Sequence, residues 1–195
     1  MSVQDDVNQA KKRPSLEEVT VDTTTIFEGK IIGLQVDTVT LPDGTTATRE
    51  IVRHPGAVAV LAIKDGRMLV VEQYRKPLER TQVEIPAGKL DAGERPEDAA
   101  KRELEEETGY RAASLIPLGA FSTSPGFADE IIYLYAADEL EEGTMKPDED
   151  EFLEVSALTM DEAFEAIRQG RIGDAKTIQA LYAWKIYEMT GSWPV

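Results

Sequence analysis

The residues best suited to chemistry in this chain are three glutamates in one short charged segment. Glu106 and Glu107 follow Glu103 by three and four positions, so both are its neighbours on one face of a helix. Like charges at these spacings destabilise a helix by about 0.2–0.5 kcal/mol per pair, and Arg102 can offset only part of this, through Asp98 or Glu106. The surplus charge requires bulk water or bound cations. Hard divalent ions such as Mg²⁺ prefer clustered oxygen ligands, which they share with substrate phosphates.

The composition of the chain excludes several other chemistries. Its 195 residues include 21 Lys and Arg against 37 Asp and Glu, one His and no Cys, for a formal net charge of −16 at pH 7. The lack of Cys excludes disulfides, thiolate zinc sites and thiol nucleophiles, and a single His argues against a Ser-His-Asp triad. The excess of negative charge argues against nucleic-acid binding. If the protein binds a phosphate-containing molecule, we expect a bound cation to mediate the contact.

The charged segment must be positioned by an element, and its pattern predicts a helix over residues 96–108. Pro96 suits the first helical turn, Glu97 and Asp98 complement the positive end of the helix, and Gly109 suits its C-terminal cap. An Asp-Gly pair at 43–44 and a Lys-Asp-Gly-Arg turn at 64–67 each predict a hairpin. The second hairpin is apolar enough to be central in a sheet.

The remaining pattern indicates a mixed sheet with helices on its faces, an α+β fold of the α/β/α sandwich type, preceded by a β-rich N-terminal part. We expect the strand pattern to begin at about residue 19, with strands at 30–36, 39–41, 45–53, 57–63, 68–74, 84–86, 118–122, 131–136 and 152–157, and two further helices at 159–169 and 174–189. The expected divisions are a mobile arm (1–16), an N-terminal β subdomain used for dimerisation (17–54) and the main domain (55–195).

A longer pattern surrounds the three glutamates. Gly88, five residues, Glu94, seven residues and then the run Arg-Glu-Leu-x-Glu-Glu-x-Gly over 102–109 resembles the Nudix box, the signature of the Nudix hydrolases. Tyr110 stands where that family usually has an aliphatic residue, a departure expected to affect packing only. The resemblance implies a sandwich of mixed sheet and helices that binds divalent metal. It also implies hydrolysis of a diphosphate linked to another group, by attack of water on phosphorus.

The same resemblance implies roles for individual residues. Arg102 would orient a carboxylate, and Gly88 and Gly109 would be structural. The implied cofactor is two or three Mg²⁺ ions, with Mn²⁺ as a possible substitute. The implied metal ligands are Glu103, Glu106, Glu107, Glu151 and the carbonyl of Ala87.

Three features outside the box are similar to the ADP-ribose pyrophosphatase subfamily. Pro125 follows Gly109 by sixteen residues, although an ordinary Pro-Gly turn is an alternative interpretation. Arg75 would contact the substrate diphosphate, unless it forms a surface salt bridge. The full set of substrate-binding residues implied by the resemblance is Phe27, Glu28, Arg49, Glu50, Arg75, Gly126 and Glu130, where Phe27 is equally interpretable as a core aromatic.

The third feature is the acidic run at residues 148–151. The resemblance implies that Glu149 is the general base, alongside Glu107 and Arg102 as the other catalytic residues, and that Glu151 reaches a metal. Four adjacent acids leave the register open by two positions, and a solvated acidic loop is the alternative. The only histidine, His54, is expected to be structural.

The function implied is hydrolysis of ADP-ribose to AMP and ribose 5-phosphate by a homodimer that exchanges its N-terminal sheets. Alternatives are a Nudix enzyme for another nucleoside diphosphate sugar and a non-catalytic sensor of an ADP-ribose-type ligand. The polar N-terminus and the lack of an 18-residue apolar run predict a cytoplasmic protein without membrane contact. A Gly-rich stretch at 170–177 has the wrong spacing for a phosphate-binding P-loop.

Overall fold

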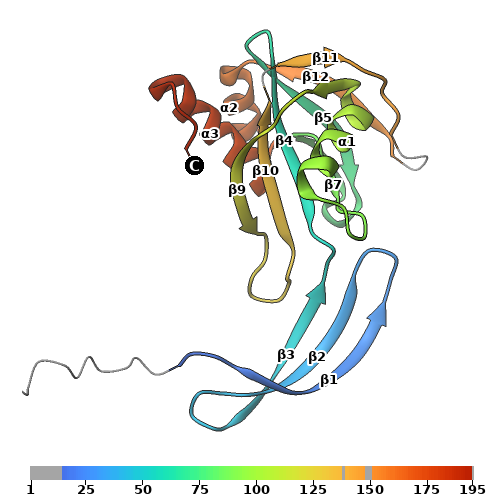
Figure 1. Ribbon diagram of the computed structural model, residues 1–195, viewed down its shortest axis with the longest axis vertical. Helices are drawn as coiled ribbons and strands as arrows, with labels where there is room; N and C mark the ends of the chain where they lie inside the picture. Colours follow the sequence, from blue (N-terminus) through green and yellow to red (C-terminus); the bar gives the residue numbers. More distant parts are fainter. Residues whose placement is uncertain (1–14, 138, 148–150, 195) are drawn as a thin grey trace, which may run out of the picture. The chain divides into compact units, whose positions relative to one another are not determined.

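The computed structural model of the chain describes residues 15–137, 139–147 and 151–194 (Figure 1). The chain divides into two compact units between Arg53 and His54, and each is described by itself. Within the described ranges, no helix combines the length and apolar character needed to cross a membrane.

The N-terminal unit is a three-stranded antiparallel sheet in the order β1-β2-β3. Its strands are β1 (Val19–Glu28), β2 (Gly33–Thr40) and β3 (Thr46–Arg53). The predicted Asp-Gly turn joins β2 to β3: Asp43 Oδ1 accepts hydrogen bonds from the backbone N (2.9 Å) and the hydroxyl (2.6 Å) of Thr45. Gly44 has a φ of 87°, a conformation that favours glycine.

The predicted interruption of the strand between residues 36 and 39 is wrong, because β2 runs through Asp37 without a break. Aspartate disfavours strands, but here its buried carboxylate accepts hydrogen bonds from Gln35 Nε2 at 2.7 Å and Thr23 Oγ1 at 2.9 Å. These partners compensate for burial of the charge, so the strand tolerates the residue.

The C-terminal unit is built on a mixed sheet. Among the described residues, seven strands form this sheet in the order β12-β5-β4-β10-β9, with β6 paired to β5 and β7 paired to β4. The β4–β10 pair is parallel and the other pairs are antiparallel. The strands are β4 (Ala57–Lys64), β5 (Arg67–Arg75), β6 (Arg80–Glu84), β7 (Ala87–Lys89), β9 (Ile116–Ser122), β10 (Ile131–Ala137) and β12 (Leu153–Leu158).

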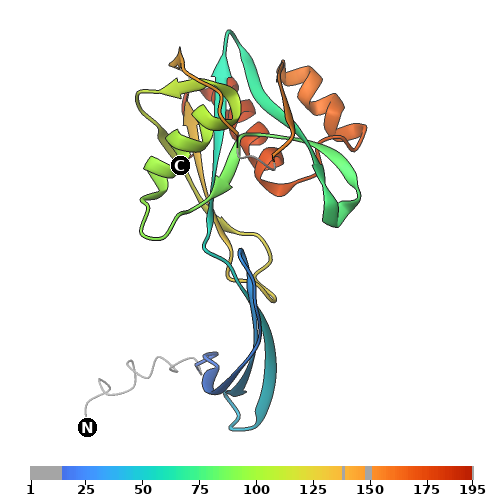
Figure 2. The same cartoon turned by 90° about the vertical axis from the view of Figure 1, so that its right-hand side faces the viewer.

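Helices cover both faces of this sheet, as predicted. They are α1 (Pro96–Thr108), α2 (Met160–Arg168) and α3 (Ala175–Thr190). Alternate residues of β4 point to opposite faces: Val60 packs in one core with Leu104 of α1, and Leu61 packs in the other with Leu181 of α3. Figures 1 and 2 show α1 on one side of β4 and β10, and α2 and α3 on the other.

The range predicted for α1 is confirmed, and those predicted for α2 and α3 agree with the structure to within one residue at each end. α1 starts at Pro96 and is capped by Gly109 at a φ of 72°. Thr159 and Glu162 form the predicted capping box of α2, and the Asp174 carboxylate accepts from the backbone of Thr177 at the start of α3. In α1, Pro96 and Gly109 set the ends of the helix and so determine which part of the sheet its glutamates face.

Short strands were missed by the sequence pattern. The strand predicted at 84–86 is wrong, because β6 spans Arg80–Glu84, and β7 was not expected. Two more short strands, β8 (Tyr110–Ala112) and β11 (Leu140–Glu142), pair with each other. A 3₁₀ turn, η1 (Lys76–Leu78), joins β5 to β6. Segments of three residues are too short to show a period, so only their long-range pairing defines them.

Candidate active site

The box residues meet where α1 crosses β7. Glu103 lies directly against the backbone of Gly88, where an added Cβ would stand 1.9 Å from Glu103 Cδ. Glu107, one helical turn on, accepts a hydrogen bond at 3.0 Å from the backbone N of Ala87 to its Oε2. The structure therefore brings Glu103, Glu107 and Ala87 together, and Gly88 is glycine because a carboxylate occupies the place of its side chain.

Arg102 connects the carboxylates around this point. Its Nε and Nη2 donate to Glu94 at 3.0 and 2.8 Å, and its Nη1 donates to Glu103 at 2.7 Å and to Glu106 at 3.1 Å. The hydrogen bond to Glu94 is the main reason that the pKa of Arg102 is raised. Of the two alternative partners expected for Arg102, Glu106 is the one observed, and Asp98 instead lies 3.8 Å from Arg95 Nε.

The pKa values of Glu103 and Glu107 are both raised above the usual value for a glutamate. Burial, reinforced by the charges of Glu103 and Glu151, raises the pKa of Glu107 to about 8 despite the hydrogen bond from Ala87. Burial also raises the pKa of Glu103, with the charges of Glu106 and Glu151 adding to it, against the opposing effect of Arg102. The surrounding protein thus leaves much of the negative charge here uncompensated.

This donor set fits a divalent metal ion. Carboxylate and carbonyl oxygens are the ligands that Mg²⁺ and Mn²⁺ prefer, and a cation would supply the charge that burial of Glu107 demands. Within the described part of the chain, no three acidic side chains already stand in a coordination arrangement. Their partners in this structure are protein groups: Arg102 donates to Glu103 and Glu106, and the backbone N of Ala87 donates to Glu107.

The acidic run before β12 is only partly described. Glu149, the predicted base, lies outside the described residues, as do Asp148 and Asp150. Glu151 is described, and its charge acts on both Glu103 and Glu107. This places Glu151 near the α1 carboxylates, as a metal partner would have to be.

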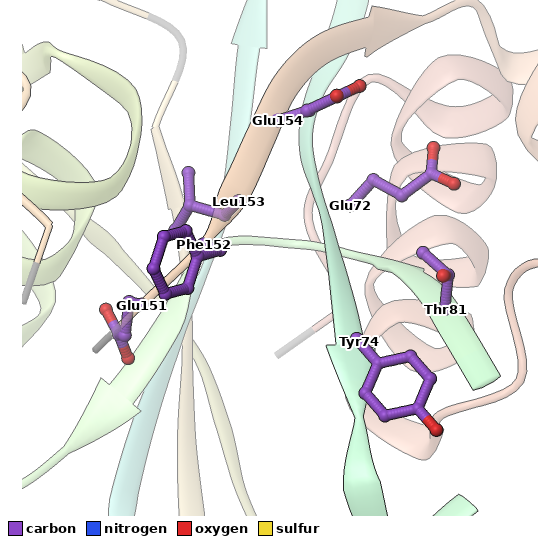
Figure 3. Close-up of a pocket in the computed structure, with 7 residues that line it drawn as sticks. All are labelled: Glu72, Tyr74, Thr81, Glu151, Phe152, Leu153 and Glu154. Atoms are coloured by element: carbon purple, nitrogen blue, oxygen red, sulfur yellow. The ribbon is translucent and has the colours of Figure 1, made fainter. Parts of the chain in front are cut away.

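A cavity of about 580 Å³ opens beside Glu151, at the ends of β5, β6 and β12 (Figure 3). Its other lining residues are Glu72, Tyr74, Thr81, Phe152, Leu153 and Glu154. Side chains alternate along β5, so Glu72 and Tyr74 project from the face opposite Leu69, which packs with α1. Glu151 therefore lies between this cavity and the acidic site on α1. Most of the residues that line the cavity lie on the sheet face opposite α1.

Arg75 lies on the α1 face of β5. Its Nε and Nη2 donate to the two carboxylate oxygens of Glu84 at 2.8 and 2.7 Å, as the salt-bridge alternative expected. The side chain is nevertheless 38% exposed, and no described residue accepts from its Nη1. A salt bridge and a phosphate contact are thus compatible, because they use different edges of the guanidinium.

The N-terminal unit carries four of the predicted substrate-binding residues. Phe27 is 53% exposed, so within its own unit it is not a core aromatic. Arg49 forms a two-pronged ion pair with Glu18, at 2.8 and 2.5 Å. Glu28 ends β1 and Glu50 lies in β3, both exposed.

The remaining two predicted substrate residues lie in the C-terminal unit. Glu130 accepts a hydrogen bond at 2.6 Å from Thr123 Oγ1, and its other oxygen is 3.6 Å from Nδ1 of His54. The Pro-Gly turn closes with a hydrogen bond from Phe127 N to Ser124 O at 3.0 Å, and Gly126 lies in it with open space around it. The ring of His54 accepts from the backbone of its own loop, in keeping with a structural role.

Sequence reasoning missed a buried ion-pair network next to Arg75. Glu84 is 3% exposed, and besides Arg75 it accepts a hydrogen bond from Nζ of Lys176, the second residue of α3. Burial alone would raise the pKa of Glu84, but Arg75 and Lys176 together lower it to about 2. Lys176 lies in the Gly-rich stretch 170–177, whose spacing does not fit a P-loop. Nothing in its local sequence indicates a partner 92 residues away.

Comparison with known proteins defines the class of this chain. A family model of the NUDIX domain matches residues 52–181, and a model of the nucleoside diphosphate sugar hydrolase N-terminal domain matches residues 18–52. The chain belongs to the Nudix hydrolase family, whose members generally need divalent metal ions.

Two similar relatives span nearly the whole chain. The ADP-ribose pyrophosphatase of Bacillus subtilis (strain 168) is 53% identical over 177 residues, covering 89% of this chain and 96% of that protein. The methanol dehydrogenase activator of Bacillus methanolicus is 54% identical over 175 residues, covering 88% and 95%. A crystal structure of an ADP compounds hydrolase shares the fold, with a TM-score of 0.79 and 21% identity over 93% of this chain and 99% of that one.

Proposed function

We propose that this chain hydrolyses the diphosphate bond of ADP-ribose to AMP and ribose 5-phosphate. The observation that carries the proposal is the pair Glu103 and Glu107, held against Ala87 and Gly88 within a complete Nudix box. The 53% identity to an ADP-ribose pyrophosphatase over most of both chains supports this choice of substrate.

The acidic residues of the Nudix box would bind the metal ions. Glu103, Glu107 and the Ala87 carbonyl would hold divalent metal, with Glu106 and Glu151 as further ligands. We propose two or three Mg²⁺ ions, replaceable by Mn²⁺. Such ions, when bound, neutralise phosphate charge and lower the pKa of a coordinated water. Arg102, which donates hydrogen bonds to Glu103 and Glu106, would orient these carboxylates.

The chemical step needs a base and a phosphate clamp. Glu149 would accept the proton of the attacking water as the new P–O bond forms and the bridging P–O bond breaks, leaving two monophosphates. Nη1 of Arg75 would donate to a phosphate oxygen while Glu84 keeps its Nε and Nη2 occupied.

Residues of both units would contact the rest of the substrate. We propose that Gly126 and Glu130 bind substrate, and that Phe27, Glu28, Arg49 and Glu50 do so from the N-terminal unit. That unit would also form the homodimer by sheet exchange, and we propose a cytoplasmic location. Exposed apolar residues on β1, namely Val19, Val21, Ile26 and Phe27, support a role in association.

A substrate panel tests the activity. Purified protein is incubated with ADP-ribose, UDP-glucose and GDP-mannose in Mg²⁺, and the products are separated by chromatography. The proposal expects AMP from ADP-ribose at the highest kcat/KM. Equal rates on all three would instead favour a general nucleoside diphosphate sugar hydrolase, and ADP-ribose retained without turnover would favour a sensor.

The second relative favours one further candidate function, activation of a dehydrogenase. Its 54% identity is as high as that of the pyrophosphatase. The test adds the chain, with Mg²⁺, to a purified methanol dehydrogenase and measures the rate of alcohol oxidation. An unchanged rate removes this candidate and leaves the hydrolase assignment as it stands.

A further inference from the structure

The buried network around Glu84 links the start of α3 to the site. Lys176 Nζ donates to Glu84 and, at 3.2 Å, to Asp174 Oδ2, which also caps the backbone N of Thr177 at 2.9 Å. Glu84 in turn receives both prongs of Arg75. One chain of charge-assisted hydrogen bonds thus runs from the N-terminal cap of α3 to the Arg75 guanidinium.

The same turn of α3 also holds the backbone that leads into the box. The hydroxyl of Thr177, a fully buried residue, accepts a hydrogen bond at 3.0 Å from the backbone N of Ile85. Ile85 is followed two residues later by Ala87, whose own N–H binds Glu107. The start of α3 therefore holds the backbone between β6 and β7, just before Ala87.

Stability alone is a poor explanation for this network. Burying charges is costly, and a buried ion pair is often replaceable by apolar side chains with no loss of stability. Lys176 and Glu84 have only 11% and 4% of their side chains exposed, yet Arg75, at the end of the chain, is 38% exposed. The network therefore holds one partly exposed guanidinium, that of Arg75, in a fixed orientation. The charge of Glu107 acts on this guanidinium.

The charges of the network sum to zero, with Arg75 and Lys176 against Glu84 and Asp174. Without the Lys176 ammonium, a net negative charge would remain buried beside the place where a phosphate is to bind. Repulsion of the phosphate and a less constrained Glu84 would then act together, and both would weaken ground-state binding of a diphosphate.

We propose that Lys176 is a positioning residue for the diphosphate site: through Glu84 it fixes Arg75 so that the Nη1 edge of the guanidinium receives a phosphate oxygen. The inference rests on the proposed function for the identity of the substrate, and on the contacts above for the role of Lys176. It makes α3, which carries no part of the Nudix box, a component of substrate recognition.

The test compares Lys176→Met with Lys185→Met, a matched change at an exposed lysine of the same helix. For Lys176→Met we expect KM for ADP-ribose to rise about tenfold with kcat within about threefold of the wild type. Lys176→Arg, which keeps the charge, should restore most of the affinity, and Lys185→Met should match the wild type. Lys176→Gln provides a second neutral variant should the Met variant not fold.

A double-mutant cycle with Arg75→Gln separates positioning from a general structural effect. If Lys176 acts through Arg75, then Lys176→Met raises KM clearly less in the Arg75→Gln background, where only repulsion by the uncompensated negative charge remains. An equal tenfold effect in both backgrounds, or a Lys176→Met variant with the KM of Lys185→Met, would overturn the inference.

Titration with inorganic pyrophosphate and Mg²⁺ by calorimetry keeps this test independent of the reaction. If the wild type does not hydrolyse ADP-ribose, the proposed function fails, but weaker pyrophosphate binding by Lys176→Met than by Lys185→Met still supports the inference. Equal pyrophosphate binding by the two variants, or none by the wild type, overturns it even if ADP-ribose is hydrolysed.

Discussion

At the scale of single residues, the site is defined by a conflict between burial and charge. Glu107 is 3% exposed, and among the described residues only the backbone N of Ala87 donates a hydrogen bond to its carboxylate, which lies near two others. A buried acid in such surroundings is protonated in the absence of a cation. The residue is therefore suited to bind a divalent ion and poorly suited to stabilise the metal-free fold.

We predict that Glu107→Gln lowers kcat by about 100-fold or more, because it removes a metal ligand, and even residues that only support ligands contribute 10–100-fold. The variant should leave the fold intact, since an amide oxygen can still accept from Ala87 N. The measurement is steady-state hydrolysis of ADP-ribose in Mg²⁺. Near-normal turnover by this variant would exclude Glu107 as a ligand.

The same substitution should change how the stability of the metal-free protein depends on pH. A folded-state pKa of about 8, raised from 4.5, favours the protonated carboxyl in the fold. The wild type therefore loses free energy of unfolding as pH rises from about 4.5 to about 8. Urea unfolding in EDTA should show a smaller loss in Glu107→Gln, and parallel curves for the two proteins would contradict the raised pKa.

Gly88 provides an independent test of how Glu103 is placed. Gly88→Ala would put a Cβ 1.9 Å from Glu103 Cδ, so the carboxylate must move. We predict roughly 10–100-fold weaker Mg²⁺ binding by calorimetry, the range for loss of support to a ligand. Gly33→Ala, where a Cβ makes an ordinary 3.7 Å contact in the N-terminal unit, is the control. Unchanged affinity in Gly88→Ala would mean that Glu103 is not a ligand.

At the scale of elements, β6 and α3 depend on the buried charges that join them. Arg75 and Lys176 lower the pKa of Glu84 to about 2, so its contribution to stability is present above about pH 4.5 and is lost as pH falls towards 2. Glu84→Gln leaves two cations short of a partner and should cost roughly 3–5 kcal/mol at pH 7.

The measurement for Glu84→Gln is denaturant unfolding across pH. The deficit of the variant relative to the wild type should shrink as the pH falls from 4.5 towards 2, because the wild type loses the same charge. A deficit that is constant over this range would show that the ion pairs with Arg75 and Lys176 do not stabilise the fold.

How far the sequence predicts these elements depends on the range of the interaction. The ends of α1 follow from Pro96 and Gly109, which act locally, and the box spacing predicted that Glu103 and Glu107 share a face. By contrast, the strand through Asp37 depends on Thr23 of another strand, so local propensity gave the wrong break.

The contacts within the candidate site can also be separated into local ones, which the sequence predicts, and long-range ones, which it does not. Arg102 and Glu106 lie one helical turn apart, and their contact follows from helical spacing, whereas the contacts of Arg102 with the adjacent Glu103 and with Glu94 before the helix do not. The Lys176–Glu84 contact spans 92 residues and depends on how α3 packs, which no local pattern indicates. Glu149, the predicted general base, lies outside the described residues, so its role stays a prediction.

At the scale of the whole molecule, a chain of net charge −16 is expected to gain stability from divalent cations chiefly at one place. A ligand that binds only the folded state stabilises it by about 2.7 kcal/mol at 100 times its Kd. Mg²⁺ should therefore raise the Tm of the wild type by several degrees and that of Glu107→Gln by much less. Equal rises in both would indicate diffuse binding to the acidic surface.

The central claim is that the acids of α1 act through bound metal to split ADP-ribose. The most direct measurement is the initial rate of AMP formation from ADP-ribose by metal-free protein titrated with Mg²⁺. We predict no AMP in EDTA, a saturable rise with Mg²⁺ in the wild type, and almost none at any Mg²⁺ concentration in Glu103→Gln or Glu107→Gln. AMP formation that persists in EDTA, or that these two substitutions leave unchanged, would contradict the account.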